Sequence, residues 1–179
     1  MQTRTPWWTP SAVLYVGNHL PDGARVFEWG SGGSTLWLTD RGATVISIED
    51  DPEWARSGPS TVRLVEPSAK GTIQSHGRFY DDYVAAIHPN VDLDLVVVDG
   101  RARVACVQRA IDHVRPGGML LLDDSDRTGY GAAHEALASW DVQHFRGPKA
   151  HGIDLCQTSI WTRPTDVGPA QPTESALQP

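Results

Sequence analysis

The stretch that decides the fold is VFEWGSGGSTLWLTDRGATVISIEDDPEWA, which runs from Val26 to Ala55. An apolar run over 25–29 leads into a glycine-rich turn, a segment with helical spacing over 33–41, and a second apolar run over 44–49. This order of strand, turn, helix and strand predicts a βαβ unit. A glycine turn in that position lets a ligand lie against bare backbone, close to the positive N-terminus of the helix. The stretch therefore predicts a small-molecule site.

The rest of the chain repeats this alternation of short apolar runs and helical segments, which predicts an α/β fold with a mostly parallel sheet and helices on both faces. The run LDLVVVDG, from Leu93 to Gly100, is almost unbroken in its apolar character, as expected when both faces of a central strand are covered. The last two strands suit an antiparallel hairpin. The further predicted helices span 9–20, 103–114 and 130–140, and the further strands span 62–65, 93–98, 119–124, 142–145 and 153–162.

The composition favours one domain. With 179 residues, of which 40% are hydrophobic, the chain can enclose a single sizeable core, and we expect it over 1–163. The segment 164–179 is rich in Pro, Ser, Thr and Gly, which predicts a flexible tail. Cys106 and Cys156 are too few for a disulfide framework, so both are expected to be buried thiols.

The charge and the apolar runs exclude some partners. A net charge of −7 offers no broad basic surface, so we expect no nucleic-acid partner. No apolar run approaches the roughly 18 residues that a membrane span requires, and the first residues lack a charged start followed by an apolar run. We therefore expect a cytoplasmic protein without membrane contact, acting on a small molecule.

Two acids flank the glycine turn. Glu28 stands two residues before the first glycine, where it would repel a pyrophosphate and attract an ammonium group. Glu49 follows 21 residues later, at the predicted end of the second strand, where an acid can accept hydrogen bonds from ribose hydroxyls. The third glycine of the dinucleotide pattern is replaced by Thr35. The pair of acids suits S-adenosylmethionine, with these expected contacts: Glu28, Gly30, Ser31, Gly32, Ser34, Glu49 and Asp50.

The segments FEWGSGGST and ISIED resemble motif I and the acid that follows it in class I S-adenosylmethionine-dependent methyltransferases. The likeness continues through LDLVVVDG and VRPGGMLLLDD to the closing hairpin, over about residues 9 to 163. The resemblance implies a Rossmann-like, doubly wound, three-layer fold. Its seven-stranded sheet would have the order 3-2-1-4-5-7-6 and an antiparallel last strand. The resemblance also implies a cofactor at the carboxyl ends of strands one, two and four, with an adenine contact near Ser68 and a further cofactor contact at Asp99.

Three aspartates end the predicted central strands. Asp99 closes strand four, and Asp123 and Asp124 close strand five, so their carboxylates are expected to meet over the crevice. The pattern resembles the divalent-metal-dependent O-methyltransferases of the catechol and macrolide-sugar type, which implies Mg²⁺ on these three side chains and catalytic roles for Asp99 and Asp123. The alternative is a solvated polar turn that caps the next helix.

The general base has no motif of its own. Where catechol-type enzymes carry a lysine, three residues after the strand-four acid, this chain has Ala102. His134, His151 or an aspartate of the cluster remain candidates for the base.

Candidate acceptor contacts follow the strand ends. RVACVQRA and DDSDRTGY resemble segments of bacterial methyltransferase-like proteins, and more distantly of plant polysaccharide methyltransferases. Arg101, Arg127 and Tyr130 are then candidate contacts for an anionic or sugar-like substrate, together with Arg103. Substrate selection is also expected from the segments PWWTP, 70–83 and 125–130. Within the first, Trp7 and Trp8 either form an aromatic lid or pack the terminus onto the core or onto a second subunit of a homodimer, and packing is favoured.

The leading hypothesis is a methyltransferase that uses S-adenosylmethionine to methylate an oxygen atom of a small hydroxylated metabolite, with Mg²⁺ as a further expected cofactor. Two alternatives stay open. A nicotinamide-dependent oxidoreductase is disfavoured by Glu28 and Thr35. A non-catalytic module that binds the nucleoside or supports a partner enzyme would suit the small size and the missing base.

Overall fold

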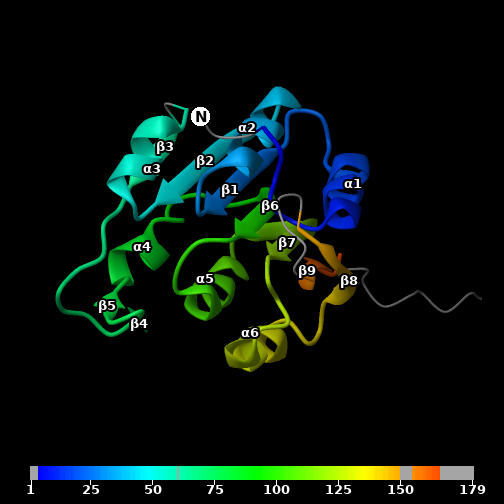
Figure 1. Cartoon of the computed structure of the whole chain (residues 1–179). Helices are drawn as coiled ribbons and strands as arrows, with labels where there is room; N and C mark the ends of the chain where they lie inside the picture. The colour runs from blue at the N-terminus through cyan, green and yellow to red at the C-terminus, as the bar shows by residue number, and fades with distance from the viewer. Residues whose placement is uncertain (1–3, 60, 150–154, 166–179) are drawn as a thin grey trace, which may run out of the picture.

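The computed structural model of the chain describes residues 4–59, 61–149 and 155–165, and within them a seven-stranded sheet with the order β3-β2-β1-β6-β7-β9-β8 (Figure 1). Neighbouring strands from β3 to β7 are parallel, and β9 is antiparallel to both β7 and β8. The predicted order and the antiparallel last strand are confirmed. The strands are β1 Arg25–Trp29, β2 Thr44–Glu49, β3 Val62–Leu64, β6 Leu93–Val98, β7 Val114–Leu122, β8 Asp141–Pro148 and β9 Leu155–Thr162.

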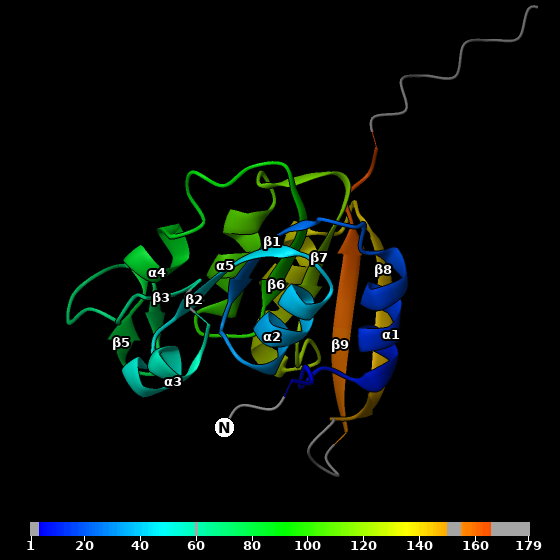
Figure 2. The same cartoon turned by 90° about the horizontal axis from the view of Figure 1, so that it is seen from above.

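Helices cover both faces of the sheet, which gives the predicted three layers. One face is covered by α1 and α2, and the other by α4, α5 and α6, while α3 lies beside β2 and β3 (Figures 1 and 2). Figure 2 shows α1 at the β8 edge and α4 at the opposite end of the sheet. The helices are α1 Pro10–His19, α2 Gly33–Asp40, α3 Pro52–Ser57, α4 Asp81–Ala85, α5 Arg103–Ala110, the 3-10 turn η1 Thr128–Tyr130, and α6 Gly131–Ala136.

The two faces of the sheet carry separate apolar cores. Along β6, Leu95 and Val97 pack into the core under α1 and α2, whereas Val96 and Val98 pack into the core under α4, α5 and α6. All four side chains are fully buried. Because successive side chains of a strand point to opposite faces, a strand between two helix layers is apolar at every position. This explains the unbroken run that the sequence analysis placed at the centre.

Some element boundaries differ from the predicted ones. The helix predicted over 103–114 ends at Ala110, and β7 already begins at Val114, which pairs with Leu93. The segment RPGG therefore lies inside β7, where the pairing with β6 is irregular and Gly117 has φ +73°. A Cβ on Gly118 would lie 2.8 Å from the carbonyl oxygen of Leu93. These glycines thus allow a bulged strand rather than ending a helix.

Other predicted elements shift at their ends. The helix predicted over 130–140 is divided into η1 and α6 and ends at Ala136, and β8 extends beyond the predicted 142–145. The prediction missed α4 and a small hairpin of β4 Gln74–Ser75 with β5 Arg78–Phe79. The start of the predicted strand at 153–154 and most of the predicted tail, from 166 onward, lie outside the described residues.

Two simple expectations concern cysteines and membranes. Cys106 and Cys156 are both buried and free, as predicted. Among the helices of the described part of the chain, not one combines the length and the apolar character needed to cross a membrane.

Candidate active site

A pocket of about 400 Å³ opens at the carboxyl ends of β1, β2, β6 and β7, where the sequence analysis expected the crevice. Its wall combines backbone of the glycine turn with charged side chains from several strand ends. The lining residues are Trp7, Gly30, Ser31, Gly32, Gly33, Ser34, Glu49, Asp50, Asp51, Trp54, Asp99, Gly100, Arg101, Arg103, Asp124, Arg127 and Lys149.

Two glycines let the turns after β1 and β6 touch. Gly30 has φ +91°, and a Cβ there would lie 2.7 Å from the backbone nitrogen of Gly100. A Cβ on Gly100 would overlap the hydroxyl oxygen of Tyr83 and would lie 2.9 Å from the backbone nitrogen of Gly30. Only residues without a side chain allow this approach. The floor of the pocket is therefore bare backbone from two neighbouring strand ends.

Glu49 faces this turn from the end of β2. One carboxylate oxygen accepts hydrogen bonds from the backbone nitrogen (2.9 Å) and the hydroxyl (3.1 Å) of Ser31. The other oxygen accepts from the backbone nitrogens of Asp50 (2.9 Å) and Asp51 (3.1 Å). Burial raises the pKa of Glu49, although these donors act in the opposite direction. Glu49 thus fixes the glycine turn to the second strand and lies on the pocket wall, as predicted.

Glu28 has a different place from the one expected. Its side chain is fully buried and is not among the pocket residues. The carboxylate accepts hydrogen bonds from the hydroxyls of Ser34, Thr35 (2.5 Å) and Ser47 (2.6 Å). Burial raises the pKa of Glu28, and the three hydroxyls oppose that rise. The expected direct contact with a ligand is therefore corrected, because Glu28 joins β1, α2 and β2 beneath the turn.

Thr35, the departure from the dinucleotide pattern, belongs to the same network. Its hydroxyl donates to Glu28 and accepts from the backbone nitrogen of Gly32 at 3.0 Å. A glycine at position 35 would leave the Glu28 carboxylate and the backbone nitrogen of Gly32 without this hydroxyl as a partner. The threonine therefore stabilises the turn in a way that the dinucleotide pattern does not.

Two tryptophans stand at the rim of the pocket. The indole nitrogen of Trp54 donates to the carbonyl of Ser31 at 2.5 Å, and its ring lies over Gly32, within 3.6 Å of where a Cβ would be. Trp7 packs edge-on against Trp54 with ring centroids 6.2 Å apart, and it is 49% exposed. Trp8, in contrast, is fully buried. The favoured packing is therefore confirmed for Trp8 and wrong for Trp7, which lines the pocket.

Asp99 ends β6 and is held by Arg103. The guanidinium donates to the Asp99 carboxylate at 3.0 Å and to its carbonyl at 2.7 Å, and it also reaches the carbonyls of Gly100 (3.0 Å) and Asp123 (2.6 Å). Arg103 thereby joins the ends of β6 and β7. Burial and the neighbouring charge of Asp123 raise the pKa of Asp99 to about 8, against the effects of Arg103 and Lys149. Asp99 can therefore exchange a proton near neutral pH.

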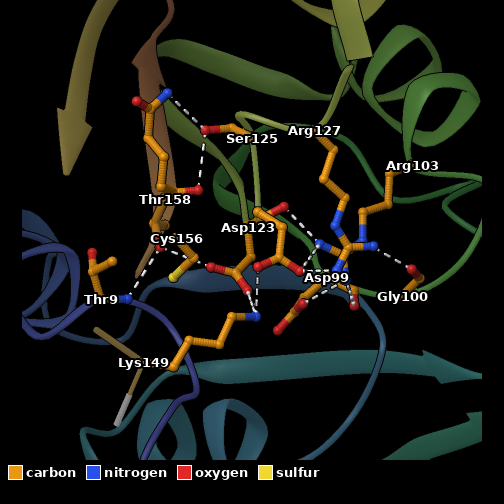
Figure 3. A network of polar contacts seen from close by, with 12 residues as sticks. Thr9, Asp99, Gly100, Arg103, Asp123, Ser125, Arg127, Lys149, Cys156 and Thr158 are labelled. Carbon is orange, nitrogen blue, oxygen red and sulfur yellow. Dashed lines mark hydrogen bonds and ion pairs between the residues drawn. The ribbon is translucent and has the colours of Figure 1, made fainter. Parts of the chain in front are cut away.

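Lys149, which follows β8, points toward the carboxylate of Asp123 (Figure 3). Its ammonium donates to Asp123 at 2.9 Å and to Asp124 at 2.6 Å. Asp123 is fully buried and also accepts from the hydroxyl of Thr158 at 2.7 Å. Asp124 forms further ion pairs with Arg127 and, at 3.5 Å, with Arg103. We call Asp99, Asp123, Asp124, Arg103, Arg127 and Lys149 the strand-end cluster.

These counter-charges correct the expected magnesium site. The structure brings Asp99, Asp123 and Asp124 to one edge of the sheet, as predicted. However, three side-chain cations already neutralise the three carboxylates, and the described residues contain no group of three or more His, Cys, Asp or Glu side chains that could hold a metal ion. Magnesium needs oxygen ligands that are free to coordinate it. The donor set does not fit Mg²⁺.

The pKa values in the cluster agree with this pairing. Burial lowers the pKa of Lys149, but Asp123 and Asp124 outweigh it, so the net shift is upward and the ammonium stays charged. Burial raises the pKa of Asp124, but Lys149, Arg103 and Arg127 outweigh it, so the net shift is downward. The structure therefore has a charged lysine where the sequence analysis expected a metal.

The remaining predicted residues divide between the pocket and its surroundings. Arg101 and Arg127 line the pocket, whereas Tyr130 packs against the core and does not. Ser68 pairs through its backbone with Phe79 outside the pocket, so its expected adenine contact is corrected. Residues 70–83 likewise contribute no lining residue, which corrects their expected part in substrate selection.

Of the two histidine candidates for the base, the structure describes His134, which does not line the pocket. The ring of His134 contacts the carbonyl of Ser125 at 2.8 Å and packs against Trp161. His134 is not a lining residue of the pocket, so the prediction of His134 as a candidate for the general base is wrong. His151 lies outside the described residues. Of the candidates named from the sequence, an aspartate of the strand-end cluster remains.

The comparisons with known proteins agree with this fold. No protein-family model and no curated protein matches the chain. A methyltransferase-like protein from Silicibacter pomeroyi matches with a TM-score of 0.55 at 23% identity, over 93% of each chain. A SAM-dependent O-methyltransferase from Thermotoga maritima matches with 0.55 at 11% identity, over 87% of this chain and 65% of its own.

A third solved structure contains the cofactor product. The 1,6-didemethyltoxoflavin-N1-methyltransferase of Burkholderia thailandensis, with bound S-adenosylhomocysteine, matches with a TM-score of 0.55 at 17% identity, over 86% of this chain and 76% of its own. The chain therefore has the fold of the class I S-adenosylmethionine-dependent methyltransferases, as the sequence motifs indicated.

Proposed function

We propose that this protein is an S-adenosylmethionine-dependent methyltransferase that methylates an oxygen atom of a small hydroxylated metabolite without a metal ion. The observation that carries the proposal is the arrangement of Glu49 and Asp99. Both lie on the wall of one pocket, at the ends of β2 and β6, on either side of the bare glycine turn. Glu49 can accept hydrogen bonds from the ribose of a nucleoside, while Asp99 lies beside the reacting atoms.

The side chains on the β2 side of the pocket fit the cofactor. Glu49, Asp50 and Asp51, which we call the acidic half, give this side a negative charge that suits a sulfonium nucleoside with an ammonium group and disfavours a diphosphate. The Glu49 carboxylate already accepts four hydrogen bonds from the chain, which fills its acceptor positions. A ribose hydroxyl that binds Glu49 therefore takes the place of the Ser31 hydroxyl as a donor. The exposed rings of Trp54 and Trp7 offer an apolar surface for the adenine.

When bound, S-adenosylmethionine supplies an electrophilic methyl group on sulfur. The chain positions the acceptor oxygen in line with that methyl group. As the oxygen–carbon bond forms and the carbon–sulfur bond breaks, Asp99 takes the hydroxyl proton of the acceptor. Arg103 holds the Asp99 carboxylate in place at 3.0 Å. The ammonium of Lys149 stabilises negative charge on the acceptor side.

Methyl transfer to a panel of hydroxylated metabolites tests the proposal. Purified protein is incubated with S-adenosylmethionine labelled on the methyl group, and labelled product is measured with and without a chelator. We expect transfer to at least one member of the panel, at equal rates with and without chelator, and a rate about a thousandfold lower with Asp99→Asn. Cofactor binding without any transfer would favour the non-catalytic module, and a rate that depends on Mg²⁺ would contradict the metal-free site.

A further inference from the structure

The pocket is divided by charge. On one side lie the carboxylates of the acidic half, and on the other side lie four cationic side chains that also line the pocket, namely Arg101, Arg103, Arg127 and Lys149. Three of these four belong to the strand-end cluster (Figure 3). A pocket whose two ends differ in charge orients two ligands of opposite charge.

The cations of the strand-end cluster have donors to spare. An ammonium group has three N–H donors, and within the described structure Lys149 uses one on Asp123 and one on Asp124. A guanidinium has five N–H donors, and within the described structure the Arg127 guanidinium donates to the carboxylate of Asp124. Arg101 contacts Asp50 through an ion pair of 3.5 Å, at the border with the acidic half. The remaining N–H groups are available to a ligand.

The cations of the cluster share a small number of acidic partners. Lys149, Arg127 and Arg103 all form ion pairs with Asp124, and Arg103 and Lys149 also pair with Asp99 and Asp123. The side chains are also accessible, since Arg127 is 55% exposed and Lys149 is 27% exposed. The cations therefore pair with their own aspartates and also present N–H groups to the pocket.

We propose that the strand-end side of the pocket is an oxyanion subsite, and that the acceptor carries a carboxylate or phosphate group that binds the free N–H of Lys149 and the guanidinium groups of Arg127 and Arg101. This inference rests on the proposed function and narrows its substrate class to anionic hydroxylated metabolites. The anionic group supplies acceptor oxygens to these N–H donors. Its hydroxyl then lies beside Asp99, toward the cofactor.

Anion binding to the cofactor-loaded protein tests the subsite. Inorganic phosphate and acetate are titrated separately into wild-type protein saturated with S-adenosylhomocysteine, at constant ionic strength, and binding is followed by calorimetry. We expect saturable binding of at least one of the two anions, and the stronger of them identifies the group that the acceptor carries. Arg127→Gln and Lys149→Gln should each weaken that binding at least tenfold.

The matched control is Arg146→Gln. Arg146 is an exposed arginine of β8 that pairs with Asp126 at 3.8 Å and does not line the pocket, so its loss should leave anion binding unchanged. Arg127→Gln keeps the test valid if Lys149→Gln does not fold, because Arg127 is the more exposed of the two.

The outcomes separate the two proposals. If S-adenosylhomocysteine binds but neither anion does, or if all variants bind the anion equally, the subsite is wrong while the methyltransferase proposal stands. If S-adenosylhomocysteine does not bind, the proposed function is wrong, and anion titration of the unloaded protein decides the subsite alone.

Discussion

The acidic half and the strand-end cluster lie in one pocket but are built in different ways. The acidic half comes from the contiguous stretch 26–55, and its central carboxylate, Glu49, is held by backbone and hydroxyl donors of its own βαβ unit. The strand-end cluster joins residues that follow β6, β7 and β8 with Arg103 of α5, and its carboxylates are held by side-chain cations. A carboxylate at a strand end thus has no fixed role. Its role depends on which partner the fold brings to it.

Loss of Asp99 should have the largest effect and should separate the two regions. In Asp99→Asn the proton acceptor is gone, so turnover should fall about a thousandfold, within the usual range for a general base. The affinity for S-adenosylhomocysteine should change little. In the wild type, the rate should rise with pH around a midpoint of about 8, the pKa of Asp99. Equal losses of turnover and cofactor affinity would place Asp99 in the cofactor site instead.

The same substitution should change the pH dependence of stability. The pKa of Asp99 is about 8 in the folded protein and near 3.8 in the unfolded chain, so the folded state keeps a proton that the unfolded state releases. Stability from this group is complete below pH 3.8 and is lost as the pH rises toward 8. Asp99→Asn should therefore gain stability relative to the wild type between pH 5 and pH 8.5, measured as the difference in Tm. A constant difference would contradict the raised pKa.

Neutralising Glu49 should affect the acidic half alone. Hydrogen bonds to a charged group contribute about 1.5–3 kcal/mol, so Glu49→Gln should weaken S-adenosylhomocysteine binding about 10- to 100-fold by calorimetry. Phosphate binding at the strand-end cluster should remain. The control is Glu53→Gln, because Glu53 is exposed and outside the pocket. If both variants bind the cofactor equally well, Glu49 is only a structural residue.

Lys149 should contribute to stability through Asp123. Lys149→Met removes the cation next to a fully buried carboxylate, and we expect a loss of about 2 kcal/mol in the free energy of unfolding at pH 7. The double variant Lys149→Met with Asp123→Asn should recover part of the loss, since no carboxylate is then left uncompensated. Additive losses in denaturant unfolding would show that the two side chains are not coupled.

The smallest effect is expected at the rim. Trp54→Phe keeps an aromatic ring but removes the donor to the carbonyl of Ser31, so cofactor affinity should fall only about threefold, the effect of one modest hydrogen bond. Trp54→Ala should cost more, because the apolar surface is lost as well. If Trp54→Phe raises the affinity, the indole competes with the cofactor for the glycine turn.

Much of the fold could be predicted because local patterns and global topology agree. The alternation of apolar runs and helical segments predicted the mostly parallel sheet, and the run around Val96 placed the central strand. The strand order came from the resemblance to class I methyltransferases. The boundaries that failed lie where tertiary pairing overrides local signals. The glycines of RPGG allow the bulge in β7 rather than ending α5, and nothing in the local sequence distinguishes these two uses.

The site could be predicted as far as it is local. Glu49 and the glycine turn lie on one βαβ unit, so spacing along the chain places them correctly. Glu28 was misplaced because its orientation depends on hydroxyl partners on α2 and β2, Ser34 and Ser47 among them. Those hydroxyls, together with the threonine in place of the third glycine, were the available signal for a buried acid.

Lys149 was missed as a site residue for a topological reason. It lies 26 residues after Asp123, and only the pairing of β8 with β9 brings it to the strand ends. No motif marks such a lysine. A charged residue in the hairpin loop next to the sheet's carboxyl edge was the one signal available.

The most direct test of the central claim is a calorimetric comparison of S-adenosylhomocysteine and NAD binding to the wild-type protein. The claim is that the acidic half selects a nucleoside with an ammonium group over a diphosphate. We predict binding of S-adenosylhomocysteine at micromolar concentrations, abolished or strongly weakened in Glu49→Gln, and no measurable binding of NAD. Tighter binding of NAD than of S-adenosylhomocysteine would contradict the account.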